Sequence, residues 1–297
     1  MFNFFTTQVT SVVPKGMHTY QGYNDVITFD NLPDYVTGGF SWGDNMMSSM
    51  DHHMQAESGE TTRRWIHKLY LPEQIIRIVF ESPHAIRNGK GIVAIRPEVV
   101  SQYKDLYHSS DVLVQEDFIY TKNSAFCLMV KPGDCPSAII AATNKNGEHI
   151  VGIGHWGRRG VDEMNPLLGM THLISNEGCD PKDIFIGIAP GIGPKYHTLT
   201  RDEIFHPQKG TVSKLPHWSR WGKYLIEPQG DDTRYHLDLL GRLLDLLHLA
   251  KIPKSNIFAD TRDTYTLALK GQTFSHRASL VEGIPQGRMI VAAALKS

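Results

Sequence analysis

The chain contains 297 residues, of which 41% are hydrophobic and 21% are charged, and its formal net charge is −1. This composition is ordinary for a globular protein with a buried core, and a near-neutral chain has no basic footprint for nucleic acid. No apolar run reaches the length of a membrane span, and the first residues lack the basic flank of a signal peptide. Three cysteines, a small and odd number, argue against a disulfide framework, so we expect reduced thiols and a cytoplasmic protein.

The first part of the chain carries one expected helix and several expected strands. Residues 59–70 begin with threonines suited to a helix cap and continue with apolar side chains at helical spacing. Short apolar runs at 75–80 and 118–120 are expected to be strands.

Three apolar runs joined by two tight connections organise the centre of the chain. The runs are 126–130, 138–142 and 150–153, and an Asn-Gly pair separates the last two. Such a pair between apolar runs is the strongest short signal for a β-hairpin, because both residues accept positive φ. Cys135 precedes the second run and His155 follows the third, so antiparallel strands can carry both side chains to the same end of a sheet.

A thiol and an imidazole at one corner admit two chemistries. They are either two ligands of a zinc ion or a nucleophile and its general base. We expect the other two cysteines, Cys127 and Cys179, to be small buried side chains.

The region after the hairpins is expected to form a helix and then a buried strand. The helix covers 161–177 and ends at Gly178, and the strand covers 183–189. The Gly/Pro loop that follows at 190–194 is either a backbone site for an anion or a rigid turn.

The last part of the chain carries the strongest helical pattern. Asp232 is the expected cap of a helix whose leucines, from Leu237 to Leu247, repeat at helical spacing. Strands are expected at 257–259 and 289–295, the second central in a sheet, whereas 206–231 has no clean period and reads as an insertion. Neither an internal repeat nor a low-complexity linker occurs, so we expect a single domain over 1–297.

Six short motifs follow one another along the chain. They are residues 106–108 (LYH), 133–136 (GDCP), 155–160 (HWGRRG), 188–192 (IAPGI), 274–277 (FSHR) and 287–288 (GR). In this order they resemble the Gln-Val-His, Ala-Asp-Cys-x-Pro, His-Ala-Gly-Trp-Arg-Gly, Ile-Gly-Pro-x-Ile, Phe-Ser-Tyr-Arg and Gly-Arg motifs of the YfiH-like, or laccase-domain, family. Residues 38–41 (GGFS) weakly resemble the family's N-terminal Gly-Gly-x-Ser, and the likeness covers roughly residues 36–297.

The resemblance implies a fold of the α/β (α+β) class, with mixed sheets in a four-layer α/β/β/α arrangement, and a metal site. The family's metal ligands fall on His108, Cys135 and His155 of this chain. Two imidazoles and one thiolate match a catalytic zinc ion with an open fourth position, and copper is the alternative metal.

The resemblance also implies an enzyme that acts on purine nucleosides, by phosphorolysis of adenosine or inosine or by deamination of adenosine. Arg159, Arg277 and Arg288 are then the candidate ligands of phosphate and substrate, because guanidinium is a planar fork for phosphate. Asp117 and Asp134 are candidate supports of the metal ligands. The expected partners are a purine nucleoside and phosphate, with neither nucleic acid nor membrane, and the sequence leaves the oligomeric state open.

The chain departs from the family's pattern close to these ligands. Trp156 and Arg158 stand where the block has Ala and Trp, and His276 stands where the closing motif has Tyr. We expect these changes to alter substrate preference, because Trp156 adds bulk and Arg158 adds charge beside a ligand.

Other functions use the same residues. Cys135 and His155, with His108 orienting the base, would suit an amide hydrolase or deamidase, and one branch of the family is linked to editing of peptidoglycan precursors. The family also implies copper-dependent phenol oxidation, although this chain lacks the multiple His-x-His sites of ordinary multicopper oxidases. A non-catalytic descendant that binds a nucleoside or a partner is the remaining alternative.

Overall fold

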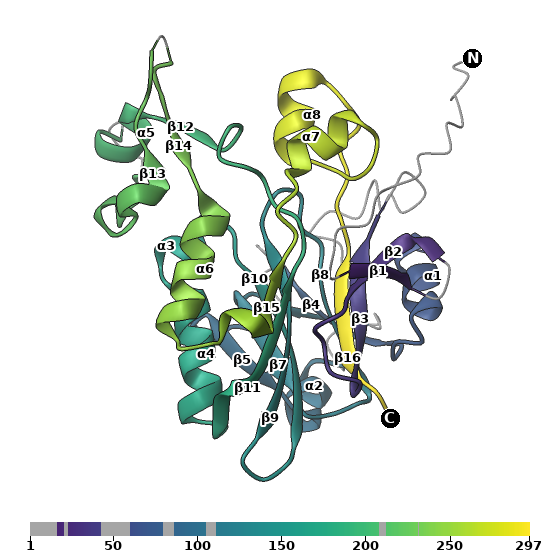
Figure 1. Ribbon diagram of the computed structural model, residues 1–297. Coiled ribbons are helices and arrows are strands. Elements are labelled where there is room, and N and C mark those ends of the chain that lie inside the picture. Colours follow the sequence, from purple (N-terminus) through teal and green to yellow (C-terminus); the bar gives the residue numbers. More distant parts are fainter. Residues whose placement is uncertain are drawn as a thin grey trace, which may run out of the picture.

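Two large β-sheets lie face to face, and helices cover the outer side of each (Figure 1). The computed structural model describes residues 17–20, 23–42, 60–79, 86–104, 111–207, 212–230 and 232–297. This arrangement confirms the mixed-sheet, four-layer α/β/β/α fold that the resemblance implied.

The first sheet has seven strands and mixed pairing. In spatial order they are β1 (Met17–Tyr20), β2 (Tyr23–Phe29), β3 (Val36–Ser41), β16 (Val291–Leu295), β8 (Phe126–Val130), β4 (Gln74–Ile78) and β6 (Asp111–Val114). Strand β4 runs parallel to both of its neighbours, whereas β16 is antiparallel to β3 and β8. The strand predicted at the end of the chain is therefore central, in the fourth of seven positions.

The second sheet has six strands and contains the predicted hairpin. In spatial order they are β15 (Ile257–Ala259), β11 (Cys179–Ile188), β9 (Ser137–Asn144), β10 (His149–His155), β7 (Phe118–Thr121) and β5 (Ile92–Ile95). Strands β9 and β10 pair antiparallel from His149 opposite Thr143 to His155 opposite Ser137. Gly147 in the turn has φ +80°, as the Asn-Gly signal required.

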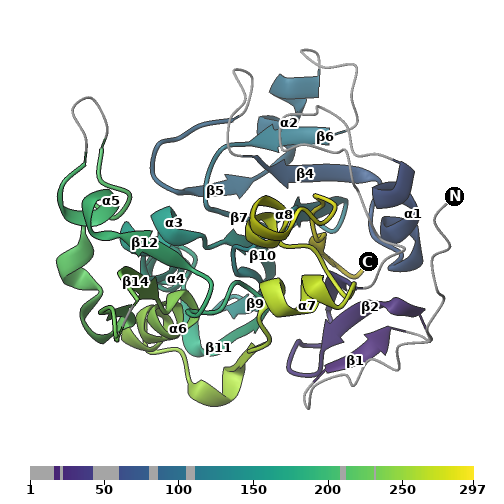
Figure 2. The ribbon, with the colours of Figure 1, turned by 90° about the horizontal axis from the view of Figure 1, so that it is seen from above.

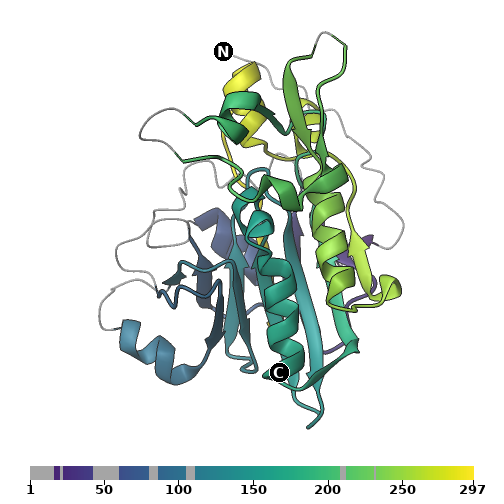
Figure 3. The same cartoon turned by 90° about the vertical axis from the view of Figure 1, so that its left-hand side faces the viewer.

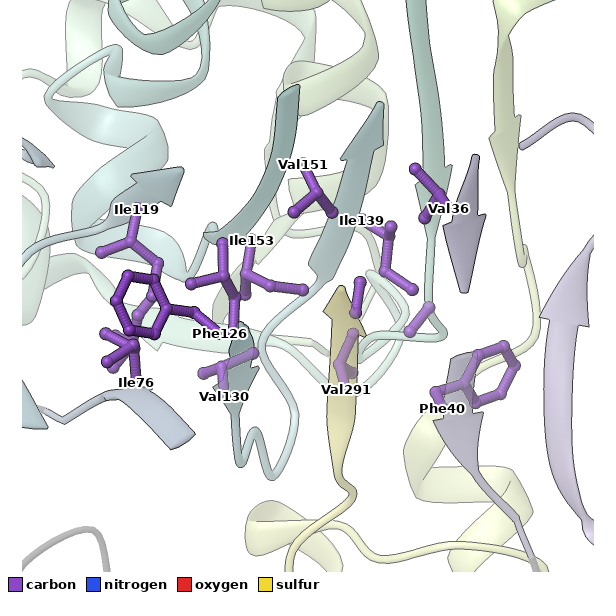
Figure 4. Close-up of a cluster of buried hydrophobic side chains, with 14 of the residues drawn as sticks. Val36, Phe40, Ile76, Ile119, Phe126, Val130, Ile139, Val151, Ile153 and Val291 are labelled. Atoms are coloured by element: carbon purple, nitrogen blue, oxygen red, sulfur yellow. The ribbon is translucent and has the colours of Figure 1, made fainter. Parts of the chain in front are cut away.

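The core between the sheets follows from the alternation of side chains along each strand. In β8, Phe126 and Val130 point to this inner core, whereas Cys127 points to the outer face. In β10, Val151 and Ile153 point inward in the same way, and Figure 4 shows residues of both sheets meeting in this layer. Both faces of the central strands are apolar, because both are covered.

Helices cover the outer faces, as Figure 3 shows for the six-stranded sheet. Along that sheet lie α4 (Asn165–Ser175) and α6 (Leu239–Leu249), which share one buried cluster with its strands. The outer face of the seven-stranded sheet is covered by α1 (Glu60–Lys68), through Trp65 and Ile66. The remaining helices are α2 (Pro97–Lys104), α3 (Arg158–Asp162), α5 (Arg201–Phe205), α7 (Thr264–Leu269) and α8 (His276–Glu282), with 3₁₀ turns at Trp218–Arg220, Gly222–Tyr224 and Lys254–Asn256.

A small three-stranded sheet stands at the same end of the molecule as α7 and α8 (Figure 1). Its order is β12 (Thr198–Thr200), β14 (Arg234–Leu237) and β13 (Leu225–Ile226). We call the segment from β12 to β14, residues 198–237, the lobe. The predicted insertion at 206–231 falls within this range, and whether that segment is an insertion stays a prediction.

Two helix predictions were wrong at their starts. The helix predicted over 161–177 is two helices, because Met164 adopts a left-handed conformation at φ +64° between α3 and α4. The helix predicted to start at Asp232 begins after Asp238, whose carboxylate accepts the Gly241 N–H at 2.8 Å. The residues before it form β14. Leu237 continued the leucine spacing by coincidence, but as a strand residue it is buried on the same face as Tyr235.

In the part of the chain that the structure describes, helices are too short or too polar to cross a membrane.

Candidate functional site

Strand pairing brings Cys135 and His155 together at one end of the six-stranded sheet. His155 is the last residue of β10 and lies opposite Ser137, the first residue of β9 and only two residues from Cys135. The backbone continues the pairing beyond the strands, since Trp156 donates its N–H to the Pro136 carbonyl at 2.9 Å. The predicted corner therefore forms, and a rigid hairpin holds it.

Asp117 supports the His155 side of this corner. The His155 N–H donates to the Asp117 carbonyl at 2.8 Å, and an Asp117 carboxylate oxygen lies 3.9 Å from Nδ1 of the ring. The same carboxylate accepts a hydrogen bond from the Asn165 side chain at the start of α4. Asp117 is thus fixed between α4 and the ring, and its role as a support of a metal ligand stays a prediction.

The charge of the corner is set by its own members. Burial would lower the pKa of His155, but the negative charges of Cys135 and Asp117 outweigh burial and raise that pKa to about 9. In the metal-free protein, the His155 ring is therefore protonated at neutral pH, next to a sulfur and a carboxylate.

Gly157 leaves open the space beside the thiol. A Cβ at this position would lie 2.7 Å from Cys135 Sγ and 3.5 Å from His155 Cε1, so only glycine leaves this space unfilled. A soft thiolate and an imidazole next to unfilled space suit zinc or copper, so the two described donors fit a metal ion.

The third predicted ligand, His108, lies outside the described residues. Within the ranges that are described, no group of three or more His, Cys, Asp or Glu side chains is arranged to hold a metal. The three-ligand metal site with His108 therefore stays a prediction.

A cavity of about 820 Å³ opens at this corner, between α8 and the lobe. Cys135, His155 and Asp117 line it, together with residues of α3, β12 and α8, which Figure 2 shows at the same end of the molecule. Its volume lies within the range of small-molecule sites. Glu116 shapes its rim, because this carboxylate accepts the N–H groups of Gly89 and Gly91 at 2.8 and 2.7 Å.

The predicted substrate arginines have different positions. Arg277, on α8, lines the cavity, as does Arg159, whose exposed side chain pairs with Glu163 at 2.9 Å. Arg288 is not among the lining residues, and its Nη1 donates to its own neighbour, the Gly287 carbonyl, at 2.8 Å.

Asp134 ties the cysteine loop to the C-terminal helices. Its carboxylate accepts the Thr264 hydroxyl at 2.8 Å and the Arg277 N–H at 2.7 Å. The Gly/Pro loop is also bound internally, since Ile192 donates to the Asp134 carbonyl and Gly193 to the Asp263 carboxylate. Of the two alternatives for this loop, these bonds favour the rigid turn.

The two unusual residues of the block lie in different surroundings. Trp156 is completely buried in the outer core and packs over Gly154, so its bulk does not enter the cavity. Arg158 lines the cavity, and its charge is the change that a ligand would meet.

Sequence reasoning missed two further cavity residues, His197 and Glu203. Both lie at or beside the short strand β12, which carried no clear pattern. The sequence signal that could have indicated this segment is a capping box, in which Thr200 and Glu203 bond each other's backbone at the start of α5.

Comparisons with solved structures agree with this fold. Over 95% of this chain and all of the other, the structure resembles Bacillus licheniformis hypothetical protein YfiH, with TM-score 0.67 and 19% identity. YlmD from Geobacillus stearothermophilus gives TM-score 0.63 and 19% identity over 94% of this chain and 99% of that one. Neisseria meningitidis protein NMB0706 gives TM-score 0.60 and 14% identity over 90% and 97%.

The sequence comparisons establish the family. No curated protein matches the chain. The model of the family described as multi-copper polyphenol oxidoreductase laccase matches residues 89–296, which include Asp117, Cys135 and His155. The chain therefore belongs to the multi-copper polyphenol oxidoreductase laccase family, as its motifs indicated.

Proposed function

We propose that this protein is a metal-dependent enzyme that processes purine nucleosides, by phosphorolysis of adenosine- or inosine-type nucleosides or by deamination of adenosine. The supporting observation is the juxtaposition of Cys135 and His155, beside the space left by Gly157, in the wall of a cavity of about 820 Å³. His108 completes the proposed set of metal ligands from the sequence.

Cys135 and His155 would hold the metal through sulfur and ring nitrogen. A zinc ion bound there supplies Lewis acidity at the cavity wall. Asp117, fixed by Asn165, orients the His155 ring and keeps negative charge next to it. Because the pKa of His155 is raised, this ring must give up a proton before it can act as a ligand, so metal uptake should release protons below about pH 9.

The cavity has the mixed lining that a nucleoside requires. Leu199 and Leu239 provide apolar contacts, whereas Arg277 provides a donor for phosphate or for a sugar hydroxyl. The backbone of Arg277 is held by Asp134, next to Cys135, so the cationic wall is fixed relative to the thiol.

The test combines metal analysis with product analysis. Purified protein is analysed for metal and incubated with a panel of purine nucleosides, with and without phosphate, and products are identified by mass. Cys135→Ala should lose both metal and turnover, whereas Cys179→Ala, which removes a buried thiol distant from the cavity lining, should keep both. A Cys135→Ala protein with full metal content and full rate would refute the proposal.

A second candidate function is amide hydrolysis by a Cys–His pair. The observation that favours it is the order Cys135, His155, Asp117, in which the carboxylate lies 3.9 Å from Nδ1 of a ring whose pKa the thiolate raises. Full activity of metal-free protein, abolished by alkylation of Cys135, would support this function over the first.

A further inference from the structure

Two cavity-lining side chains have buried nitrogens that lack partners. Nε of Arg158 and Nδ1 of His197 are inaccessible to solvent and have no hydrogen-bond partner among the described residues. Arg158 opens α3 just after the corner, and His197 immediately precedes β12 of the lobe. A buried polar atom without a partner costs free energy, so these two nitrogens point to a ligand that is not part of the chain.

Arg277 faces the same place from α8. Its guanidinium donates to the carbonyls of Tyr196 and Thr198, at 3.3 and 3.0 Å, and to the Thr198 hydroxyl at 3.0 Å. These partners are uncharged. They hold the guanidinium of Arg277 beside His197 and do not balance the positive charge of Arg277. Arg158 and Arg277 together lower the pKa of His197, which burial already lowers, to about 3, and the ring is therefore neutral at physiological pH.

The negative groups that act on Arg158 are Cys135, Glu203 and Asp162. Glu203 accepts Lys214 Nζ at 2.5 Å and the Thr200 N–H at 2.8 Å. Asp162, at the other end of α3, accepts the Trp221 indole N–H at 2.8 Å and a backbone N–H at 3.1 Å. Within the described residues, neither Arg158 nor Arg277 forms an ion pair with a carboxylate.

Arg158 and Arg277 form no ion pair within the described residues, and Nε of Arg158 and Nδ1 of His197 have no hydrogen-bond partner there. All three side chains line one cavity, where an anion rich in acceptor oxygens would satisfy them. Phosphate suits this wall, because its oxygens accept both the planar fork of arginine and a ring N–H.

We propose that Arg158, His197 and Arg277 form an anion subsite that binds a phosphate group, separate from the Cys135–His155 pair. The contacts described above support the subsite itself. Only the identity of the molecule that carries the phosphate rests on the proposed function. That molecule is either free phosphate, the second substrate of phosphorolysis, or a purine nucleoside that bears a 5′-phosphate. Because Arg158 stands where the family's block has Trp, the subsite is a property that this chain adds to the family pattern.

Calorimetric titration of the full chain tests the subsite with three probes: inorganic phosphate, adenosine 5′-monophosphate and adenosine. Wild-type protein should bind at least one phosphate-bearing probe. Arg158→Gln should weaken that binding by about tenfold or more and weaken adenosine binding clearly less. Arg220→Gln, which removes an exposed arginine of the same lobe outside the cavity lining, is the matched control and should bind like wild type.

The probes also separate the two sources of phosphate. Simultaneous binding of phosphate and adenosine identifies free phosphate, whereas competition between phosphate and a tighter-binding monophosphate identifies a nucleotide. Failure of wild type to bind either phosphate-bearing probe, or equal affinity in Arg158→Gln, overturns the subsite. If Arg158→Gln does not fold, Arg158→Lys is used; it keeps the charge, loses the planar fork and should bind the phosphate-bearing probes more weakly than wild type.

Failure of the subsite can be told apart from failure of the proposed function. Cys135→Ala should abolish turnover and still bind the phosphate-bearing probe, and adding Arg158→Gln to Cys135→Ala should weaken that binding as it does in wild type. A protein without metal or nucleoside turnover that still shows the Arg158 dependence would refute the proposed function and retain the subsite.

Discussion

The two sides of the cavity are built in different ways. The corner with Cys135 and His155 lies at the ends of two long strands. Both faces of these strands are buried, so the core holds the geometry of the corner. The lobe opposite it rests on strands of two to four residues and on polar contacts such as Asp162 with Trp221.

This difference separates two tasks. The corner keeps the proposed metal ligands at fixed positions, which catalysis requires, and its surroundings tolerate little change in volume. The lobe contributes charge and hydrogen bonds at the far wall, where changes in sequence cost less stability and can alter which substrate binds.

The largest expected effect is on stability, from truncating the tryptophan of the corner. Trp156→Ala should lower the free energy of unfolding by about 3–5 kcal/mol, because it empties a fully buried position. Trp218→Ala in the lobe should cost less than about 1.5 kcal/mol, since Trp218 is 44% exposed and packs mainly edge-on against Phe205. Urea unfolding measures both, and equal losses would contradict the comparison.

Should Trp156→Ala fail to fold, Trp156→Phe still tests the position. Phenylalanine keeps most of the volume and removes an indole N–H that has no partner among the described residues, so the loss should be clearly smaller than for alanine.

The next effect is local to the thiol. Gly157→Ala sets a Cβ 2.7 Å from Cys135 Sγ, and the sulfur must move to relieve this contact. We expect metal content to fall and turnover to drop by about a hundredfold, with a smaller loss of stability than for Trp156→Ala. Metal analysis and steady-state rates are the measurements, and a variant with normal metal and normal rate would show that the corner is less rigid than described.

A smaller effect is expected where the lobe is attached to α3. Asp162→Ala leaves the buried Trp221 N–H without its acceptor and should cost about 1–3 kcal/mol. Hydrogen exchange should increase in residues 215–226 and stay unchanged in β9 and β10. Asp162→Asn keeps an acceptor oxygen and should have an intermediate effect; faster exchange in the strands would mean that lobe and corner are not separate units.

The last effect is a pH dependence carried by His197, which is absent at neutral pH and grows as the pH falls below about 6.5. Burial, Arg158 and Arg277 lower the pKa of His197 to about 3 in the folded chain. Below about pH 6.5 this histidine therefore binds a proton in the unfolded chain and stays neutral in the folded chain. Stability from this residue is complete above pH 6.5 and is lost as pH falls towards 3, by at most about 1.4 kcal/mol per pH unit. His197→Gln should show a shallower loss than wild type between pH 6.5 and 4.5, and identical slopes would contradict the lowered pKa.

Much of the corner could be predicted from sequence because it depends on local signals. The Asn-Gly turn and the two continuous apolar runs beside it determine which residues of β9 and β10 face each other, and this register brings Cys135 to His155. The start of α6 could not be predicted in the same way, because the leucine spacing of a helix extends by chance into the last residue of β14.

The sequence by itself determined the central hairpin, the buried strand at the end of the chain, and the pairing of a thiol with an imidazole. Their signals lie within a few residues or within motifs read in order along the chain. Only the tertiary structure decided that Trp156 belongs to the core, that Arg158 faces the cavity, and that His197 and Arg277 lie opposite it. Those positions depend on how α3, β12 and α8 pack around one end of the sheets. Contacts between segments so distant in the chain produce no periodic pattern in the sequence.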